Sequence, residues 1–138
     1  MFRKFSTIIA LAALLLAGCR EGIIPPGDNV GMLNTPVKDN YYRSYSLRVD
    51  AANLNLNVSD SVWLNSSMTI LNISNSNYIR GTLTVNLYNP FGSLQYTEIL
   101  DNNRATVRRV IDNANIDRIE MQFRNFTGNV NIKLMAAN

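Results

Sequence analysis

The sequence has no histidine, and this absence removes several kinds of chemistry. Without an imidazole, neither Ser-His-Asp nor Cys-His catalysis is available, and the commonest transition-metal ligand is missing. Acid–base work would fall to carboxylates, and the candidates show no recognisable motif: Glu98, Asp101, Asp112, Asp117 and Glu120. We therefore predict a protein that is not an enzyme, with a small hydrolase as the alternative.

Cysteine is almost absent as well, because Cys19 is the only one. A chain with a single thiol forms no internal disulfide. Long apolar runs are also missing, since the one at residues 8–16 is shorter than the roughly 20 residues that a membrane helix needs. Arg3 and Lys4 precede this run. A positive start followed by a short apolar run is the layout of an export signal.

The apolar run closes on Leu16-Ala17-Gly18-Cys19, which resembles the lipobox of bacterial lipoprotein precursors. The resemblance covers only the start of the chain. It implies that residues 1–18 are a cleaved signal peptide and that Cys19 becomes the first residue and carries diacylglycerol and a further acyl chain such as palmitate. An ordinary secretory signal followed by a chance cysteine is the alternative.

The lipobox resemblance also predicts a location. Two or three acyl chains hold a protein on a membrane almost permanently, whereas one holds it weakly. In proteobacterial lipoproteins an Asp directly after the cysteine retains the protein at the inner membrane, and this chain has Arg20 there. The resemblance therefore implies the bacterial cell envelope, anchored through the lipid on Cys19, at the outer membrane.

A strong charge of one sign is also lacking. Removal of Arg3 and Lys4 with the signal lowers the formal net charge from +3 to +1. Such a domain has no broad positive field of the kind on which nucleic-acid binding relies. We therefore exclude nucleic acid as a partner.

Two regions follow the predicted signal peptide. Residues 19–40 are rich in proline and glycine, including Pro25, Pro26 and Gly27. We predict an extended tether there. The alternative is that part of this segment docks on the domain. From residue 41 to residue 138, apolar and polar residues alternate, as in half-buried strands.

About eight short strands and no helical stretch predict an all-β fold, a single antiparallel β-sandwich of the jelly-roll or immunoglobulin-like kind, with a small barrel as the alternative. The last two apolar stretches, residues 119–123 and 130–134, are predicted to pair as a terminal hairpin through residues 125–129. Trp63 lies between Val62 and Leu64, and the apolar triplet predicts that it belongs to the core.

Aromatic and amide side chains provide one candidate ligand surface. The tyrosines at three positions are candidate stacking platforms for a glycan: Tyr78, Tyr88 and Tyr96. Asn53, Asn55 and Asn57 share one strand face, although Asn is a poor strand former. They predict either an amide surface that binds glycans or, as we favour, a solvated face of biased composition.

Arginines provide a second candidate. A basic stripe on the outward face of the late strands would comprise Arg104, Arg108, Arg118 and Arg124. It would meet lipid phosphates or an acidic partner, or would pair with Asp112, Asp117 and Glu120, which we favour. Arg109 falls on the same strand face as core residues, where a charged side chain is not expected. We therefore predict a β-bulge that turns it away from the core.

Oxygen-rich turns are the only candidate metal site. Asp101, Asp112 and Asp117 lie in segments whose composition suits calcium. The same residues suit tight turns, because their side chains bond to the local backbone. We favour turns and predict no cofactor.

Together these features predict a lipid-anchored, non-catalytic envelope lipoprotein that acts as a binding or accessory module for an envelope protein. A carbohydrate-binding β-sandwich module and a structural surface subunit resembling those of fimbriae are the two alternatives.

Overall fold

The computed structural model describes residues 32–104 and 106–137, and in them the chain is all-β and antiparallel, as predicted. Its six strands are β1 (Val37–Tyr41), β2 (Ser44–Ser61), β3 (Thr69–Tyr88), β4 (Leu94–Leu100), β5 (Thr106–Ile111) and β6 (Arg118–Ala136). The signal peptide predicted at residues 1–18 and the lipidation predicted at Cys19 lie outside the described residues.

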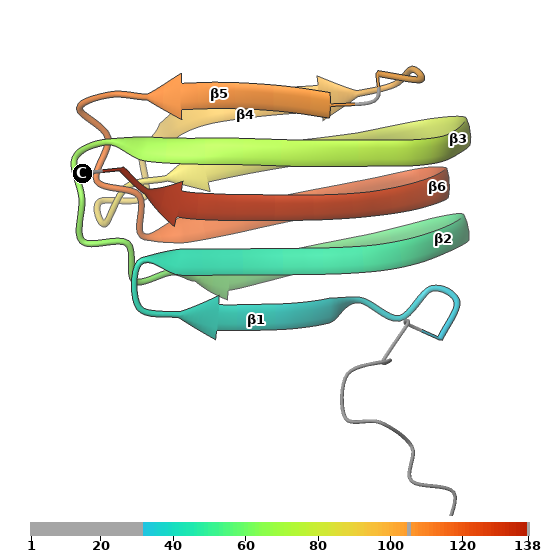
Figure 1. Cartoon of the computed structure of the whole chain (residues 1–138), viewed down its shortest axis with the longest axis horizontal. Coiled ribbons are helices and arrows are strands. Elements are labelled where there is room, and N and C mark those ends of the chain that lie inside the picture. The colour runs from blue at the N-terminus through green and yellow to red at the C-terminus, as the bar shows by residue number, and fades with distance from the viewer. Residues whose placement is uncertain (1–31, 105, 138) are drawn as a thin grey trace, which may run out of the picture.

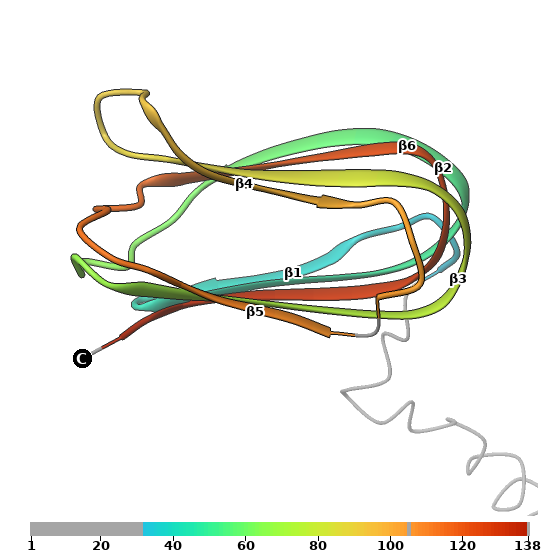
Figure 2. The same cartoon turned by 90° about the horizontal axis from the view of Figure 1, so that it is seen from above.

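One sheet folds over on itself to make the two layers of a sandwich (Figure 1, Figure 2). β2, β3 and β6 are long, and each contributes one half to each layer. The first layer has the order β1, β2, β6, β3, β5, and the second has the order β2, β6, β3, β4. β6 is central in both layers, because it pairs with β2 on one side and with β3 on the other.

The three long strands bend together at one end of the sandwich, which we call the bend end (Figure 2). Asn53, Asn77 and Asn125 have positive φ there, as does Gly81 at +92°. A Cβ at Gly81 would collide with the main-chain oxygens of Arg124 and Asn125, so only glycine fits this crossing. The turns at the opposite end form what we call the loop end: residues 42–43, 62–68, 89–93 and 112–117.

The core lies between the layers and consists of the inward residues of the three long strands. Twelve side chains on them are fully buried: Leu47, Leu71, Ile73, Leu83, Val85, Leu87, Ile119, Met121, Phe123, Phe126, Ile132 and Leu134. The rings of Phe123 and Phe126 meet edge to face, with centroids 5.7 Å apart. The alternation in the sequence therefore predicts the core well, because each half-strand exposes one face only.

The predicted terminal hairpin is wrong. Residues 118–126 and 128–136 are halves of one strand, and they pair with β2 and β3 in different layers rather than with each other. Asn125 and Gly128 bend the chain without reversing it. Phe126, in the middle of the supposed turn, is fully buried, which a solvent-exposed turn residue would not be.

The folded domain begins earlier than residue 41. Asn34 binds the backbone of Asp50 at 2.7 Å, and residues 37–41 form the edge strand β1. The last part of the predicted tether therefore docks on the domain, because it completes the edge of the first layer. Within residues 32–104 and 106–137 we find no helix of the length and apolarity required to span a membrane.

Candidate functional site

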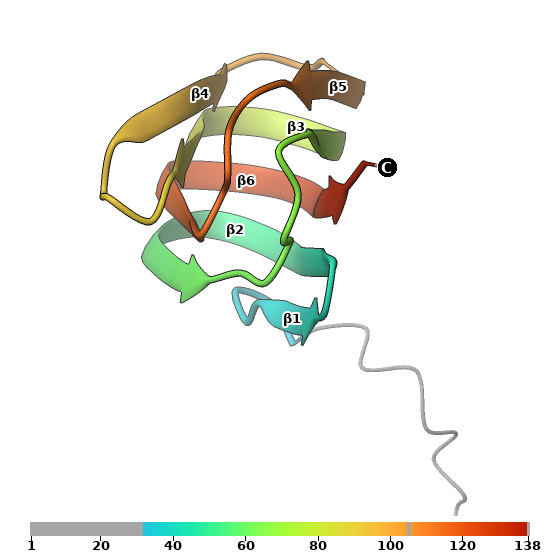
Figure 3. The same ribbon diagram turned by 90° about the vertical axis from the view of Figure 1, so that its left-hand side faces the viewer.

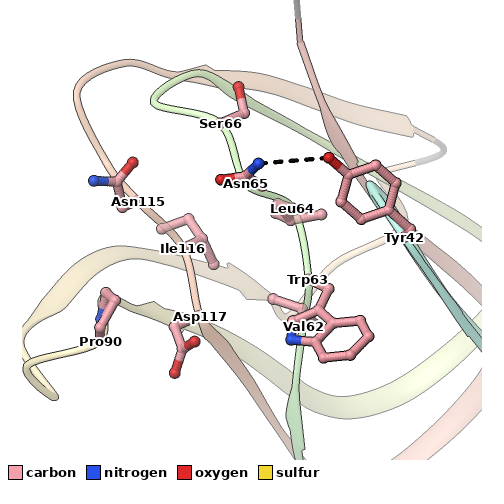
Figure 4. Close-up of a pocket in the computed structure, with 10 residues that line it drawn as sticks. All are labelled: Tyr42, Val62, Trp63, Leu64, Asn65, Ser66, Pro90, Asn115, Ile116 and Asp117. Carbon is pink, nitrogen blue, oxygen red and sulfur yellow. Dashed lines mark hydrogen bonds between the residues drawn. The ribbon is translucent and has the colours of Figure 1, made fainter.

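Four connections that are distant in sequence come together at the loop end (Figure 3). A groove of about 620 Å³ opens between them (Figure 4). This volume is in the range typical of small-molecule sites. Ten residues line it: Tyr42, Val62, Trp63, Leu64, Asn65, Ser66, Pro90, Asn115, Ile116 and Asp117.

Trp63 is exposed in this groove, so the prediction that it belongs to the core is wrong. After β2 ends at Ser61, Val62 and Leu64 point inward and are 2% and 1% exposed. Trp63, between them, points outward and is 76% exposed. The period of two continues beyond the end of the strand, and it turns the largest ring of the triplet toward solvent.

Backbone hydrogen bonds tie the walls of the groove together. The N–H of Arg43 donates to the carbonyl of Trp63 at 2.7 Å, and the N–H of Val62 donates to the carbonyl of Asp117 at 2.7 Å. The N–H of Asp117 in turn donates to Tyr88 at 2.9 Å. These bonds join three of the four connections to one another and to the end of β3.

The lining combines rings, a small apolar floor and uncharged polar groups. Figure 4 shows the rings of Tyr42 and Trp63 on one side and Pro90, Asn115 and Asp117 on the other. The floor includes Leu64 and Ile116, which are buried. The amide of Asn65 donates to the Tyr42 hydroxyl at 3.4 Å. Asp117 is the single charged side chain among the ten lining residues.

The tyrosines predicted as platforms do not line this groove and do not come together. Tyr78 is half-buried at the bend end, where its hydroxyl lies 2.8 Å from the carbonyl oxygens of both Gly81 and Asp101, which share its single O–H donor. Arg118 covers the ring of Tyr88, with 4.4 Å between the guanidinium carbon and the ring centroid. Tyr96 is half-buried at the β4 edge of the second layer.

The four arginines of the predicted stripe are spread over both layers. Arg108 is exposed on β5 of the first layer, and Arg104 lies in the β4–β5 connection. Arg118 and Arg124 lie on β6 in the second layer, where Arg118 is 3.5 Å from Glu120. Arg124 donates to the Asn57 amide oxygen at 2.9 Å.

Two clusters of polar side chains close the long edges of the sandwich. In the first, which we call the Asp60 clasp, Lys38 and Tyr45 of the first layer bind the Asp60 carboxylate at 2.9 and 2.7 Å. Burial, followed by the hydrogen bond to Asp60, raises the pKa of Tyr45 above its ordinary value.

In the second cluster, which we call the Glu98 clasp, buried Glu98 of β4 accepts hydrogen bonds from Tyr96 and Arg109 and is 3.5 Å from Arg104. Burial and the bond to Glu98 raise the pKa of Tyr96. The bulge predicted at Arg109 is wrong, since the register of β3 with β5 is unbroken. Arg109 points inward but lies on an edge strand, so its guanidinium reaches Glu98 in the opposite layer.

The asparagines on β2 are used within the protein. The amide of Asn55 donates to the Asn125 side chain at 3.0 Å and accepts from the Asn125 backbone at 3.0 Å. The backbone of Asn53 binds Thr127 at 2.9 Å. These bonds hold the bends of β2 and β6 together, so the amides do not form a free surface for a glycan.

The aspartates of the candidate calcium site lie at opposite ends. Asp101 is beside Tyr78 at the bend end, whereas Asp112 and Asp117 are in the β5–β6 connection at the loop end. In the part of the chain that the structure describes, there is no group of three acidic, cysteine or histidine residues able to hold a metal ion.

Comparisons with known proteins find only distant similarity, and only among solved structures. No protein-family model and no curated protein matches the sequence. Among solved structures, a protein of the disulfide-linked pili of Bacillus endospore appendages has a TM-score of 0.44 and 12% identity, and the match covers 75% of this chain and 90% of that one.

Two further structures are similar at lower scores. CsCBM6-3 from Clostridium stercorarium, solved with cellobiose, has a TM-score of 0.29 and 16% identity, covering 75% of this chain and 82% of that one. A carbohydrate-binding module specific for non-crystalline cellulose has a TM-score of 0.30 and 12% identity, covering 70% and 69%. Likeness at this level leaves the function to be argued from this chain's own side chains.

Sequence reasoning missed Tyr42, Asn65 and Asn115 as members of the groove. They lie in three different connections, and nothing in the sequence indicates which connections share an end of the sandwich. For Trp63 a signal was present, because the parity of Val62 and Leu64 already pointed it outward.

Proposed function

We propose that this chain is the precursor of a lipid-anchored, non-catalytic binding module of the bacterial cell envelope, and that the groove at the loop end is its binding site. The observation that carries the proposal is that the chain enters the domain at the end opposite the groove. Asn34 makes two side-chain hydrogen bonds with the backbone of Ala52, at 2.8 and 3.0 Å, next to the bend of β2.

This arrangement suits a tethered module. Each layer is about eight residues long, so the groove is separated from the point of entry by roughly 25 Å at about 3.3 Å per strand residue. A lipid on Cys19 would hold the bend end toward the membrane and present the groove away from it. The groove would then be open to a partner in the envelope.

The groove also fits binding better than catalysis. Among its ten lining residues Asp117 is the single titratable acid, and no second carboxylate stands opposite it as glycoside hydrolysis requires. The structural-subunit alternative would use a different part of the domain. Strand addition needs an exposed sheet edge, which here would be β1, β4 or β5, because β6 is paired on both sides in both layers.

The anchor is tested by Cys19→Ala. We expect the variant to lose metabolic labelling with palmitate and to leave the membrane fraction, while its circular dichroism stays that of a β protein. Unchanged labelling would refute the anchor.

The site is tested by photocrosslinking in cells with a benzophenone amino acid. At position 115 we expect adducts with an envelope component. Position 79 is the matched control, because Ile79 is 73% exposed at the bend end. Equal adducts from both positions, or none from position 115, would contradict a binding site in the groove.

A further inference from the structure

The exposed rings are the first indication of what the groove binds. Trp63 and Tyr42 are 76% and 63% exposed, although the same domain buries Phe123 and Phe126 completely. A large ring that faces solvent beside a hollow gives no packing to the fold and offers a flat apolar surface to a ligand. A sugar ring matches this surface, because one of its faces carries only C–H groups.

The polar side chains of the groove supply both acceptors and donors. Asp117 and Asn115 have no side-chain partner within the described residues, and Asn65 uses one N–H on Tyr42 and keeps its amide oxygen available. Ser66 is already engaged with the carbonyls of Met68 and Ala137. A ligand rich in hydroxyl donors would satisfy these acceptors.

The charge of the groove disfavours an anionic ligand. No lysine or arginine is among the ten lining residues, and Asp117 contributes a negative charge. A phosphate, a sulfate or a uronic acid would meet this carboxylate with no cation to offset it. Neutral sugars carry no such penalty.

The backbone of the groove argues against an extended peptide. A peptide that adds to a sheet binds mainly through main-chain groups. Here the N–H of Val62 and the carbonyls of Trp63 and Asp117 are already bonded within the protein. These three positions are therefore closed to the main chain of a peptide, whereas the side chains and rings of the groove are open to a ligand.

We infer that the groove binds a neutral carbohydrate, with Trp63 and Tyr42 stacking on the sugar and Asp117, Asn115 and Asn65 accepting from its hydroxyls. This inference rests on the proposed function only in taking the groove as the binding site. It names the class of ligand, which the proposed function leaves open.

The test uses the only tryptophan of the chain as its reporter, since Trp63 lies in the groove. The full lipidated protein, in a zwitterionic detergent that carries no sugar, is titrated with cello-, chito-, malto- and xylo-oligosaccharides. We expect at least one series to change the Trp63 emission saturably. Asp117→Asn and Asn115→Ala should each weaken that binding about tenfold, because the first removes the charge of the acceptor and exchanges one acceptor oxygen for an N–H donor, and the second removes a hydrogen-bonding amide.

Calorimetry extends the test to variants of the reporter itself. Trp63→Ala should abolish detectable binding, and Trp63→Phe should retain part of it. Phe91→Ala is the matched control, because Phe91 is 92% exposed on the neighbouring β3–β4 turn but does not line the groove, so its loss should leave the affinity unchanged. Circular dichroism checks that each variant is folded.

The outcomes separate this inference from the proposed function. If no neutral oligosaccharide binds while position 115 still crosslinks to an envelope protein, the carbohydrate is excluded and the binding module stands with a protein partner. Binding only of anionic glycans would overturn the neutral assignment. Equal loss of binding in Phe91→Ala and Trp63→Ala would place the contact outside the groove.

Discussion

The two ends of the sandwich use the same kinds of residue for opposite purposes. At the bend end, Asn55 and Asn125 hydrogen-bond to each other. These bonds hold together β2 and β6 where both strands pass from one layer to the other. At the loop end, Asn115 and Asp117 have no side-chain partner within the described residues, and Trp63 is exposed. An asparagine-rich composition therefore says little about function until it is known which amides the fold has already used.

The ends also differ in what joins the layers. Three strands cross between the layers at the bend end. Toward the loop end, noncovalent contacts such as the Asp60 clasp on the β1–β2 edge and the backbone bond from Arg43 to Trp63 perform this role. The bend end should consequently determine stability, whereas the loop end should tolerate substitution.

The largest difference is expected between two glycines with positive φ. Gly81→Ala should lower the free energy of unfolding by about 3 kcal/mol, because its Cβ would strike the backbone of β6. Gly92→Ala at the loop end, where φ is +75° and no atom lies within 4 Å, should lower it by only about 1 kcal/mol. Urea denaturation measures both values, and equal losses would refute the contrast.

The second-largest effect is expected at alkaline pH, which should weaken the Asp60 clasp. The pKa of Tyr45 is raised by burial and by its bond to Asp60, so its contribution is complete below the unfolded pKa of about 10 and is lost as pH rises above it. Stability should fall above pH 10 by up to about 1.4 kcal/mol per pH unit for this group.

Tyr45→Phe is the control for this pH dependence. The variant should be less stable at neutral pH, because Asp60 loses a donor, and its stability should depend less on pH above 10. Tyr96 in the Glu98 clasp and Tyr88 beside Glu120, whose pKa values are also raised, would contribute to the remaining dependence. Parallel alkaline curves for the two proteins would contradict the assignment to Tyr45.

A smaller effect is expected from the asparagines. Asn55→Ala removes two hydrogen bonds at the bend end and should destabilise the fold by about 1 kcal/mol. Asn115→Ala at the loop end should change stability by less than about 0.5 kcal/mol. Thermal unfolding of the two variants side by side checks the difference, and a larger loss for Asn115→Ala would show that its amide has a structural role.

The sequence predicted the all-β class and much of the core, because each half-strand alternates with a period of two. Ile119, Met121 and Phe123 are buried as expected. The positions at which the long strands pass from one layer to the other were not predictable in the same way. Residues 125–129 have the composition of a turn whether the chain reverses or passes to the other layer, and the partners of β6 decide between these outcomes. The groove depends on four separate connections, so local pattern could not reveal it.

The smallest effect tests the claim that Trp63 is not part of the core. Truncation of a buried tryptophan costs about 3–5 kcal/mol, but Trp63→Ala should change the free energy of unfolding by less than about 0.5 kcal/mol, because the ring is 76% exposed. For the same reason, the native emission of Trp63 should already lie near that of a solvated indole and shift little on unfolding. A loss of more than about 2 kcal/mol, or a large red shift on unfolding, would mean that the ring packs against the domain, and the loop end would then resemble the bend end in serving the fold.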